Sequence, residues 1–146
     1  MKVMIVEDEM LLAMELQWEI EAAGHTVVGQ AASGAQALEL LETSPPEFAF
    51  VDIQLQDGPR GIDFGRALAE RSIPYVFVSG NIKKLPPDFA GAIGAIEKPY
   101  TMNGISNALE YLSAVITGDE DRSPPASLVL AQDTLQTNPS KSVQRI

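Results

Sequence analysis

An alternation of short apolar runs with helically spaced segments is the feature that most limits the fold of this chain. Five apolar runs can form strands: residues 2–6 (KVMIV), 25–31 (HTVVGQA), 48–52 (FAFVD), 73–80 (IPYVFVSG) and 92–97 (AIGAIE). They are apolar almost throughout, rather than at every second position, which is typical of parallel strands buried on both faces. Strands that alternate with helices favour an α/β fold, in which helices cover both faces of the sheet.

The segments between these runs predict helices. Apolar residues recur at helical spacing in four of them: Leu12 to Ala23, Ala37 to Leu41, Phe64 to Leu68 and Ile105 to Leu112. Ser33 and Gln36 form a capping-box signature at the start of the second helix, and Thr101 is a candidate N-cap for the last one. Between the fourth and fifth strands, Pro86 and Pro87 exclude a long regular helix.

The length of 146 residues favours one domain followed by a tail. We expect the domain to cover residues 1–117, because the sequence then changes to a polar linker, GDEDRSPPAS. Residues 118–146 are too few for a second core and are expected to be mostly disordered. The less favoured alternative is that residues 127–131 (SLVLA) add a strand to a sheet edge or dock on the domain.

Composition narrows the classes of function. The chain has no cysteine, which excludes disulfides and thiolate zinc sites, and a single histidine, His25, cannot form a histidine cluster. A formal net charge of −10 disfavours nucleic acid as a partner, because such binding needs basic patches. No apolar run approaches the roughly 18 residues that span a membrane, and the acidic start MKVMIVEDE does not fit a secretory signal. We therefore expect a cytoplasmic protein without a membrane or nucleic-acid partner.

Polar side chains stand at the carboxyl ends of four predicted strands: Glu7 and Asp8, Asp52, Ser79, and Lys98. Ligands of open α/β sheets bind beyond the carboxyl ends of the strands. If these strands are neighbours, the five side chains converge on one site. Each residue alone also fits a turn or a helix start, but their joint placement at successive strand ends indicates a functional site.

The residue types at this site suit phosphoryl chemistry. Three neighbouring carboxylates, Glu7, Asp8 and Asp52, repel one another, and each would tend to become protonated. A divalent cation removes that repulsion, and oxygen ligands open to water and a phosphoryl group suit Mg²⁺. Lys98 can hold a carboxylate or phosphoryl oxygen, and the Ser79 hydroxyl can donate to one. The set therefore predicts phosphoryl transfer onto a carboxylate.

At these residues the chain resembles the receiver domain of bacterial two-component response regulators, over about residues 1–117. The resemblance implies a flavodoxin-like (βα)5 fold, a doubly wound five-stranded parallel sheet of strand order 2-1-3-4-5. It also implies the following roles: Asp52 as phosphoacceptor and metal ligand, Asp8 as direct metal ligand, Glu7 as a ligand through water, the backbone carbonyl of Gln54 as a further ligand, Ser79 as the switch hydroxyl, and Lys98 as the lysine of a Lys-Pro motif. The resemblance further implies that the Lys98–Pro99 bond is cis, an isomer that X-Pro bonds can adopt at modest cost.

The chain also departs from the family pattern. The acid pair is Glu7-Asp8 rather than the frequent Asp-Asp, and the loop after Asp52 (DIQLQDGPRG) lacks the usual Met-Pro. Ala95 stands three residues before the lysine, where the family usually has an aromatic switch partner. Together with PYVFVSGN, these departures resemble an atypical, alphaproteobacterial-style subgroup of single-domain regulators.

The resemblance implies a stand-alone response regulator that a sensor histidine kinase phosphorylates on Asp52 with Mg²⁺. It would then bind a downstream protein or phosphotransferase, or act as a phosphate sink for the kinase, as a monomer or weak dimer. A rival hypothesis is a Mg²⁺-dependent phosphohydrolase with an Asp nucleophile, but Gln54 stands where many such enzymes need a second acid. Another is an FMN binder, which the acidic EDEM after the first strand disfavours, because it would repel phosphate.

Overall fold

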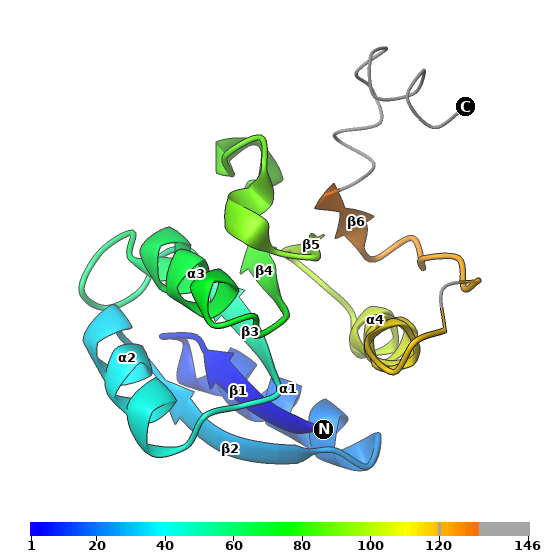
Figure 1. The fold of residues 1–146 in the computed structure, drawn as a ribbon, viewed down its shortest axis with the longest axis horizontal. Helices are drawn as coiled ribbons and strands as arrows, with labels where there is room; N and C mark the ends of the chain where they lie inside the picture. Colours follow the sequence, from blue (N-terminus) through cyan, green and yellow to red (C-terminus); the bar gives the residue numbers. More distant parts are fainter. Residues whose placement is uncertain (120, 132–146) are drawn as a thin grey trace.

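The computed structural model describes residues 1–119 and 121–131 of the chain (Figure 1). Its helices and strands follow the predicted alternation. In chain order they are β1 (Lys2–Val6), α1 (Met10–Ala22), β2 (Thr26–Ala31), α2 (Gly34–Thr43), β3 (Phe48–Asp52), α3 (Gly61–Glu70), β4 (Tyr75–Ser79), β5 (Gly94–Glu97), α4 (Met102–Ile116) and β6 (Val129–Leu130).

The described strands form one six-stranded sheet of order β2-β1-β3-β4-β5-β6. The first five strands are parallel, so the predicted order 2-1-3-4-5 is confirmed. The central strands β3 and β4 are buried at every position, as their continuous apolar sequences predicted. Two predicted caps are also confirmed, because the Ser33 hydroxyl accepts from the backbone N–H of Gln36 and Thr101 accepts from that of Gly104.

Helices cover both faces of the sheet, as in a doubly wound fold (Figure 1). On one face, α2 and α3 pack over a cluster of buried side chains that includes Leu41, Phe64 and Phe77. On the other face, α1 and α4 pack over a second cluster that includes Leu16 and Leu109. This double cover explains why the strands are apolar on both sides.

The connection from β4 to β5 differs from a full (βα)5 pattern. It contains two short 3-10 helices, Ile82–Lys84 and Phe89–Gly91, where a regular helix would complete the fourth βα unit. Pro86 and Pro87 between them explain this, because proline lacks the backbone N–H that continues a helix. The predicted flavodoxin-like fold is therefore confirmed, and so is the prediction that the two prolines exclude a long regular helix between the fourth and fifth strands.

The predicted tail contributes an element to the sheet. Val129 and Leu130 form β6, which pairs antiparallel with Ala95 and Gly94 of β5. The sequence favoured a mostly disordered tail over an added edge strand, and for this short stretch the structure shows the added strand. An apolar LVLA segment inside a polar tail can pair here because β5 would otherwise expose an apolar edge. Residue 120 and residues 132–146 lie outside the described residues.

None of the described helices combines the length and the apolar character that crossing a membrane requires.

Candidate functional site

The predicted acidic residues meet at the carboxyl edge of the sheet. Glu7 and Asp8 follow β1, and Asp52 is the last residue of the adjacent strand β3. One carboxylate oxygen from each of the three lies within 4.8 Å of the other two. Glu7 and Asp52 are buried, whereas Asp8 is half-buried. Parallel pairing causes this meeting, because it brings the ends of β1 and β3 to the same edge.

Lys98 reaches the same cluster from the end of β5. Its Nζ donates to Oδ2 of Asp52 at 2.9 Å and lies 2.8 Å from Oε1 of Glu7. Its side chain is 17% exposed, so these charges interact with little screening by water. Burial lowers the pKa of Lys98, but the hydrogen bonds and charges of Glu7 and Asp52 outweigh it and raise the pKa overall. Lys98 is therefore a fixed positive charge at neutral pH.

The Lys98 backbone is also anchored. Its N–H donates to the Ser79 carbonyl at 2.7 Å, and the Lys98–Pro99 peptide bond is cis, as the sequence predicted.

The surroundings of Glu7 disfavour its ionised form. Burial first, and then the neighbouring Asp52, raise the pKa of Glu7 to about 7 against the lowering effect of Lys98. Oε1 of Glu7 makes no well-directed hydrogen bond among the described residues, although the Lys98 ammonium is close to it. The site thus holds more negative charge than its single lysine compensates.

The donor set fits a divalent cation. Three carboxylates and one ammonium leave a formal charge of −2, and the close carboxylates supply hard oxygen ligands. Mg²⁺ prefers such oxygens and retains waters beside them. The negative charge that Lys98 leaves uncompensated is consistent with a further cationic partner at this edge.

The loop after Asp52 is held by residues that the sequence reasoning missed. Gln54 is exposed, and beyond it Leu55 and Gly58 exchange backbone hydrogen bonds in a tight turn. Within this turn, the Asp57 carboxylate accepts from the backbone N–H groups of Gly34 and Ala35 at 2.8 and 3.2 Å. Those hydrogen bonds lower the pKa of Asp57. The sequence feature that could have indicated this contact is the acid in the QDG turn, because helix N-termini attract carboxylates.

Gly61 lets α3 begin directly against the end of β3. A Cβ at this position would lie 2.0 Å from the carbonyl oxygen of Asp52 and 2.6 Å from the Cα of Ile53. The Gly61 N–H donates to the Ile53 carbonyl at 3.0 Å. Glycine is required here by close approach of two backbones, and it fixes the segment that carries Asp52.

Ser79 ends β4, the strand beside β3, and is 5% exposed. Its hydroxyl accepts from the backbone N–H of Asn81 at 3.1 Å, and it makes no hydrogen bond to Asp52 among the described residues. The structure therefore places Ser79 at the predicted edge with its hydroxyl turned to its own loop.

Two further residues bear on the site. Ala95 is fully buried in β5, between Phe77 of β4 and Val129 of β6. Tyr100 follows the Lys-Pro pair, and its buried hydroxyl has no hydrogen-bond partner among the described residues. Burial raises the pKa of Tyr100 to about 12, and the charge of Glu7 adds to this shift.

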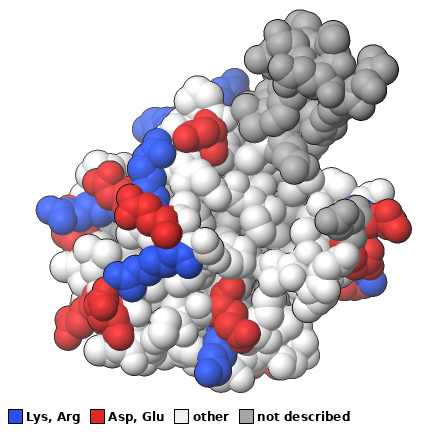
Figure 2. Space-filling view, viewed as in Figure 1, with Lys and Arg blue, Asp and Glu red and all other residues white. Residues whose placement is uncertain are grey.

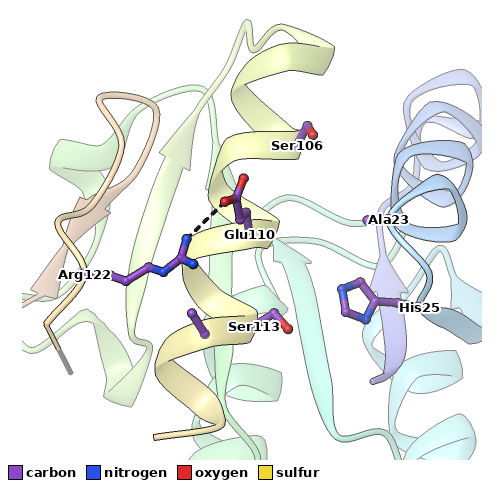
Figure 3. A pocket seen from close by; sticks show the side chains of 7 residues that line it. Ala23, His25, Ser106, Glu110, Ser113 and Arg122 are labelled. Carbon is purple, nitrogen blue, oxygen red and sulfur yellow. Dashed lines mark hydrogen bonds and ion pairs between the residues drawn. The ribbon is translucent and has the colours of Figure 1, made fainter. Parts of the chain in front are cut away.

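A separate cleft of about 420 Å³ lies between the turn after α1 and helix α4 (Figure 3). His25 and Ser113 face it, and Arg122 on its wall pairs with Glu110 at 3.0 Å. Burial and then the neighbouring terminal amino group lower the pKa of His25. Among the described residues, the acidic cluster contributes none to this cleft, and the one Lys or Arg of its wall, Arg122, is already paired, so we assign no phosphoryl chemistry to the cleft.

Comparison with known proteins agrees with this geometry. The family model described as "Response regulator receiver domain" matches residues 3–110. The regulator PhyR of Methylorubrum extorquens is 35% identical over 80 residues, which are 53% of this chain and 30% of PhyR. The transcriptional regulatory protein PdtaR of Mycobacterium tuberculosis is 32% identical over 116 residues, 75% of this chain and 55% of PdtaR.

Solved structures give the same picture. PhyR from Brucella abortus matches with a TM-score of 0.65 and 31% identity, over 82% of this chain and 51% of that one. SdrG from Sphingomonas melonis matches with a TM-score of 0.64 and 34% identity, over 77% of this chain and 95% of that one. The chain thus spans between 30% and 55% of the two curated relatives, so their activities as whole proteins do not transfer directly.

Proposed function

The chain belongs to the response regulator receiver domain family, and on that premise we propose that it accepts a phosphoryl group on Asp52. Receiver domains are signalling phosphoacceptors rather than conventional enzymes, and they work with a histidine kinase and a downstream partner. The single observation that carries the assignment to Asp52 is its position between the Lys98 ammonium and the two acids that follow β1.

The other residues of the edge take distinct roles in this proposal. An oxygen of the Asp52 carboxylate attacks the phosphorus of the donor, and the bond from phosphorus to the donor nitrogen breaks as the acyl phosphate forms. Lys98, 2.9 Å from Asp52, is placed to hold a phosphoryl oxygen and offset its negative charge. The Ser79 hydroxyl would exchange the Asn81 N–H for a phosphoryl oxygen.

Glu7, Asp8, Asp52 and the Gln54 carbonyl are the residues that we propose hold Mg²⁺. When bound, the ion neutralises the acids and the phosphoryl oxygens, so that a negative donor can approach a negative site. The same residues would admit water to the acyl phosphate and assist its hydrolysis, which returns Asp52 to its carboxylate form.

A protein phosphodonor would need a docking surface beside this edge, and α1 provides one. Four apolar side chains of α1 are exposed: Met10 (75%), Leu11 (75%), Met14 (49%) and Trp18 (76%). Helix α1 begins two residues after Asp8, so these side chains lie close to the acidic edge. A contiguous exposed apolar stripe of this kind indicates a protein contact. We expect Trp18→Ala to slow phosphorylation by a histidine kinase and to leave phosphorylation by a small phosphodonor unchanged.

The direct test is labelling of the full chain by a small phosphodonor with Mg²⁺, followed by intact mass spectrometry. We expect one added phosphoryl group in the wild type and none in Asp52→Asn. Asp63→Asn, which changes an exposed acid on α3, is the matched control and should label normally. Undiminished labelling of the Asp52→Asn variant at one group per chain would refute the assignment.

A further inference from the structure

The two edges of the sheet differ in character. At one edge β2 is open, and most of its positions are partly or fully exposed. At the other edge β5 is apolar: Gly94, Ala95 and Ile96 are buried, and β6 lies along Gly94 and Ala95. An apolar edge strand presents unpaired backbone groups that bind any suitable extended segment. The β5 edge therefore needs an occupant, and residues 127–131 fill that place (Figure 1).

Residues 127–131 lie in a groove beside β5 and α4, which we call the seat. Leu128 is only 4% exposed and joins the core cluster beneath α4. The Ser127 hydroxyl donates to the carbonyl of Gly104 at 2.8 Å, and the Ala131 N–H donates to the carbonyl of Ile93 at 3.0 Å. The seat thus combines one deep apolar position with polar contacts at each end.

Two glycines make room for this segment. A Cβ on Gly94 would lie 2.4 Å from the carbonyl oxygen of Val129, and one on Gly104 would lie 3.1 Å from the Cβ of Ser127. Neither glycine has a positive φ, so the turn chemistry that usually selects glycine does not explain them. Close approach of the segment explains them: the backbone of Val129 lies against Gly94, and the side chain of Ser127 lies against Gly104.

The seat is held by few contacts and is not completely filled. Only Val129 and Leu130 pair with β5, and residues 121–124, which lead to them, are exposed. Beside Leu130 and Ala131 lies a mainly apolar cavity of about 280 Å³, lined on its other side by Ile93, Tyr111 and Val115. Figure 2 shows charged side chains gathered over α2 and α3 and a mostly uncharged surface between α3 and α4.

From this geometry we infer that the β5 edge is a docking site for an extended strand of a partner protein, and that residues 127–131 occupy it in cis. The partner strand runs antiparallel to β5. It carries a small hydroxyl residue, then a leucine-sized side chain for the deep position, and a side chain larger than alanine for the cavity beside Ala131. The docking site needs no phosphoryl group on Asp52.

Occupation in cis sets how strongly the site is masked. A tethered segment competes at an effective concentration on the order of millimolar for a short flexible linker. If the cis segment occupies the edge about 90% of the time, the apparent affinity for a free strand falls about tenfold. Weakening the cis segment should therefore tighten the binding of a free strand by about tenfold or more.

The test uses a fluorescein-labelled synthetic peptide of residues 125–131 (PASLVLA) and full-length protein. Leu128→Asp in the protein removes the deep apolar contact, and Val129→Pro is a second way to weaken the strand, because proline cannot donate to a ladder. We expect the peptide to bind both variants about tenfold more tightly than the wild type. An Ala131→Phe peptide should bind more tightly still, and a Leu128→Asp peptide should not bind. Amide NMR shifts at Gly94 and Ala95 locate the binding.

A locked protein supplies the control. The chain has no cysteine, and Ala95 and Val129 lie directly opposite each other in the antiparallel β5–β6 pair, so Ala95→Cys with Val129→Cys can form one disulfide that holds the cis segment in its seat. The oxidised form should not bind the peptide at β5. Three results would each overturn the docking site. The first is equal peptide affinity of the wild type and the weakened variants, and the second is absence of binding to both variants although they are folded. The third is peptide binding at Gly94 in the locked form.

Discussion

Glu7→Gln is expected to make the metal-free protein more stable at pH 8, although it removes one half of an ion pair. The Glu7 side chain is 2% exposed, and its pKa is raised from 4.5 to about 7, first by burial and then by Asp52. Because the folded state binds this proton more tightly than the unfolded state, ionised Glu7 lowers stability as pH rises. The cost is absent below pH 4.5 and complete above pH 7.

The size of the effect follows from the shift. Raising the pKa of Glu7 from 4.5 to about 7 corresponds to about 3 kcal/mol of differential interaction between its two protonation states. Glutamine imitates the protonated acid and escapes this cost. The free energy of unfolding of Glu7→Gln should therefore match the wild type near pH 4.5 and exceed it by about 2 to 3 kcal/mol at pH 8.

Urea denaturation in EDTA at pH 5 and pH 8 measures this difference. Far-UV circular dichroism is the suitable probe, because Trp18 is 76% exposed and its fluorescence should report folding weakly. Glu9→Gln is the matched control, since Glu9 is exposed and lies 4.0 Å from Lys98. Added Mg²⁺ should stabilise the wild type more than Glu7→Gln. A Glu7→Gln protein that is less stable than the wild type at pH 8, or a difference independent of pH, would refute the reasoning.

Three further substitutions test individual contacts. Gly61→Ala should lower the free energy of unfolding by about 3 kcal/mol or more, because a Cβ at this position has no room against the end of β3. Gly80→Ala is the control: position 80 faces open space, so this change should have little effect in the same urea titration. Tyr75→Phe should cost about 1 to 2 kcal/mol, because a buried hydrogen bond of 2.6 Å to a backbone carbonyl is lost, and Tyr100→Phe, whose hydroxyl has no described partner, should cost nothing. Lys98→Met should tighten Mg²⁺ binding up to about tenfold in titration calorimetry at low salt, because it removes the competing cation. Labelling of the same variant by a phosphodonor should fall. An unchanged Mg²⁺ affinity would contradict this prediction.

The sequence predicted where these side chains meet because parallel pairing converts positions in the chain into positions in space. Once β1, β3 and β5 are recognised as parallel strands, Asp8, Asp52 and Lys98 must reach the same edge of the sheet. The sequence could not predict that Lys98 contacts Glu7 as well as Asp52. That contact depends on side-chain length and burial at one point, and no local pattern encodes it.

Residues that act through backbone approach were harder to predict. Gly61 and Gly94 read as ordinary loop or strand glycines, and only the assembled fold shows which atoms a Cβ would meet. The Asp57 carboxylate likewise caps a helix start that lies more than twenty residues earlier in the chain. Such contacts join segments that are distant in sequence, so they follow from packing rather than from spacing.

The sequence by itself determined the parallel sheet, the double layer of helices and the edge at which the acids gather, because hydrophobic periodicity and strand direction are local properties that repeat along the chain. The tertiary structure alone decided what occupies the β5 edge. Whether the LVLA segment stays free or pairs depends on two opposing terms: the conformational entropy that the segment loses, and the free energy gained by covering the apolar edge built from residues 92–97. This balance is set only when the segment and the edge are brought together.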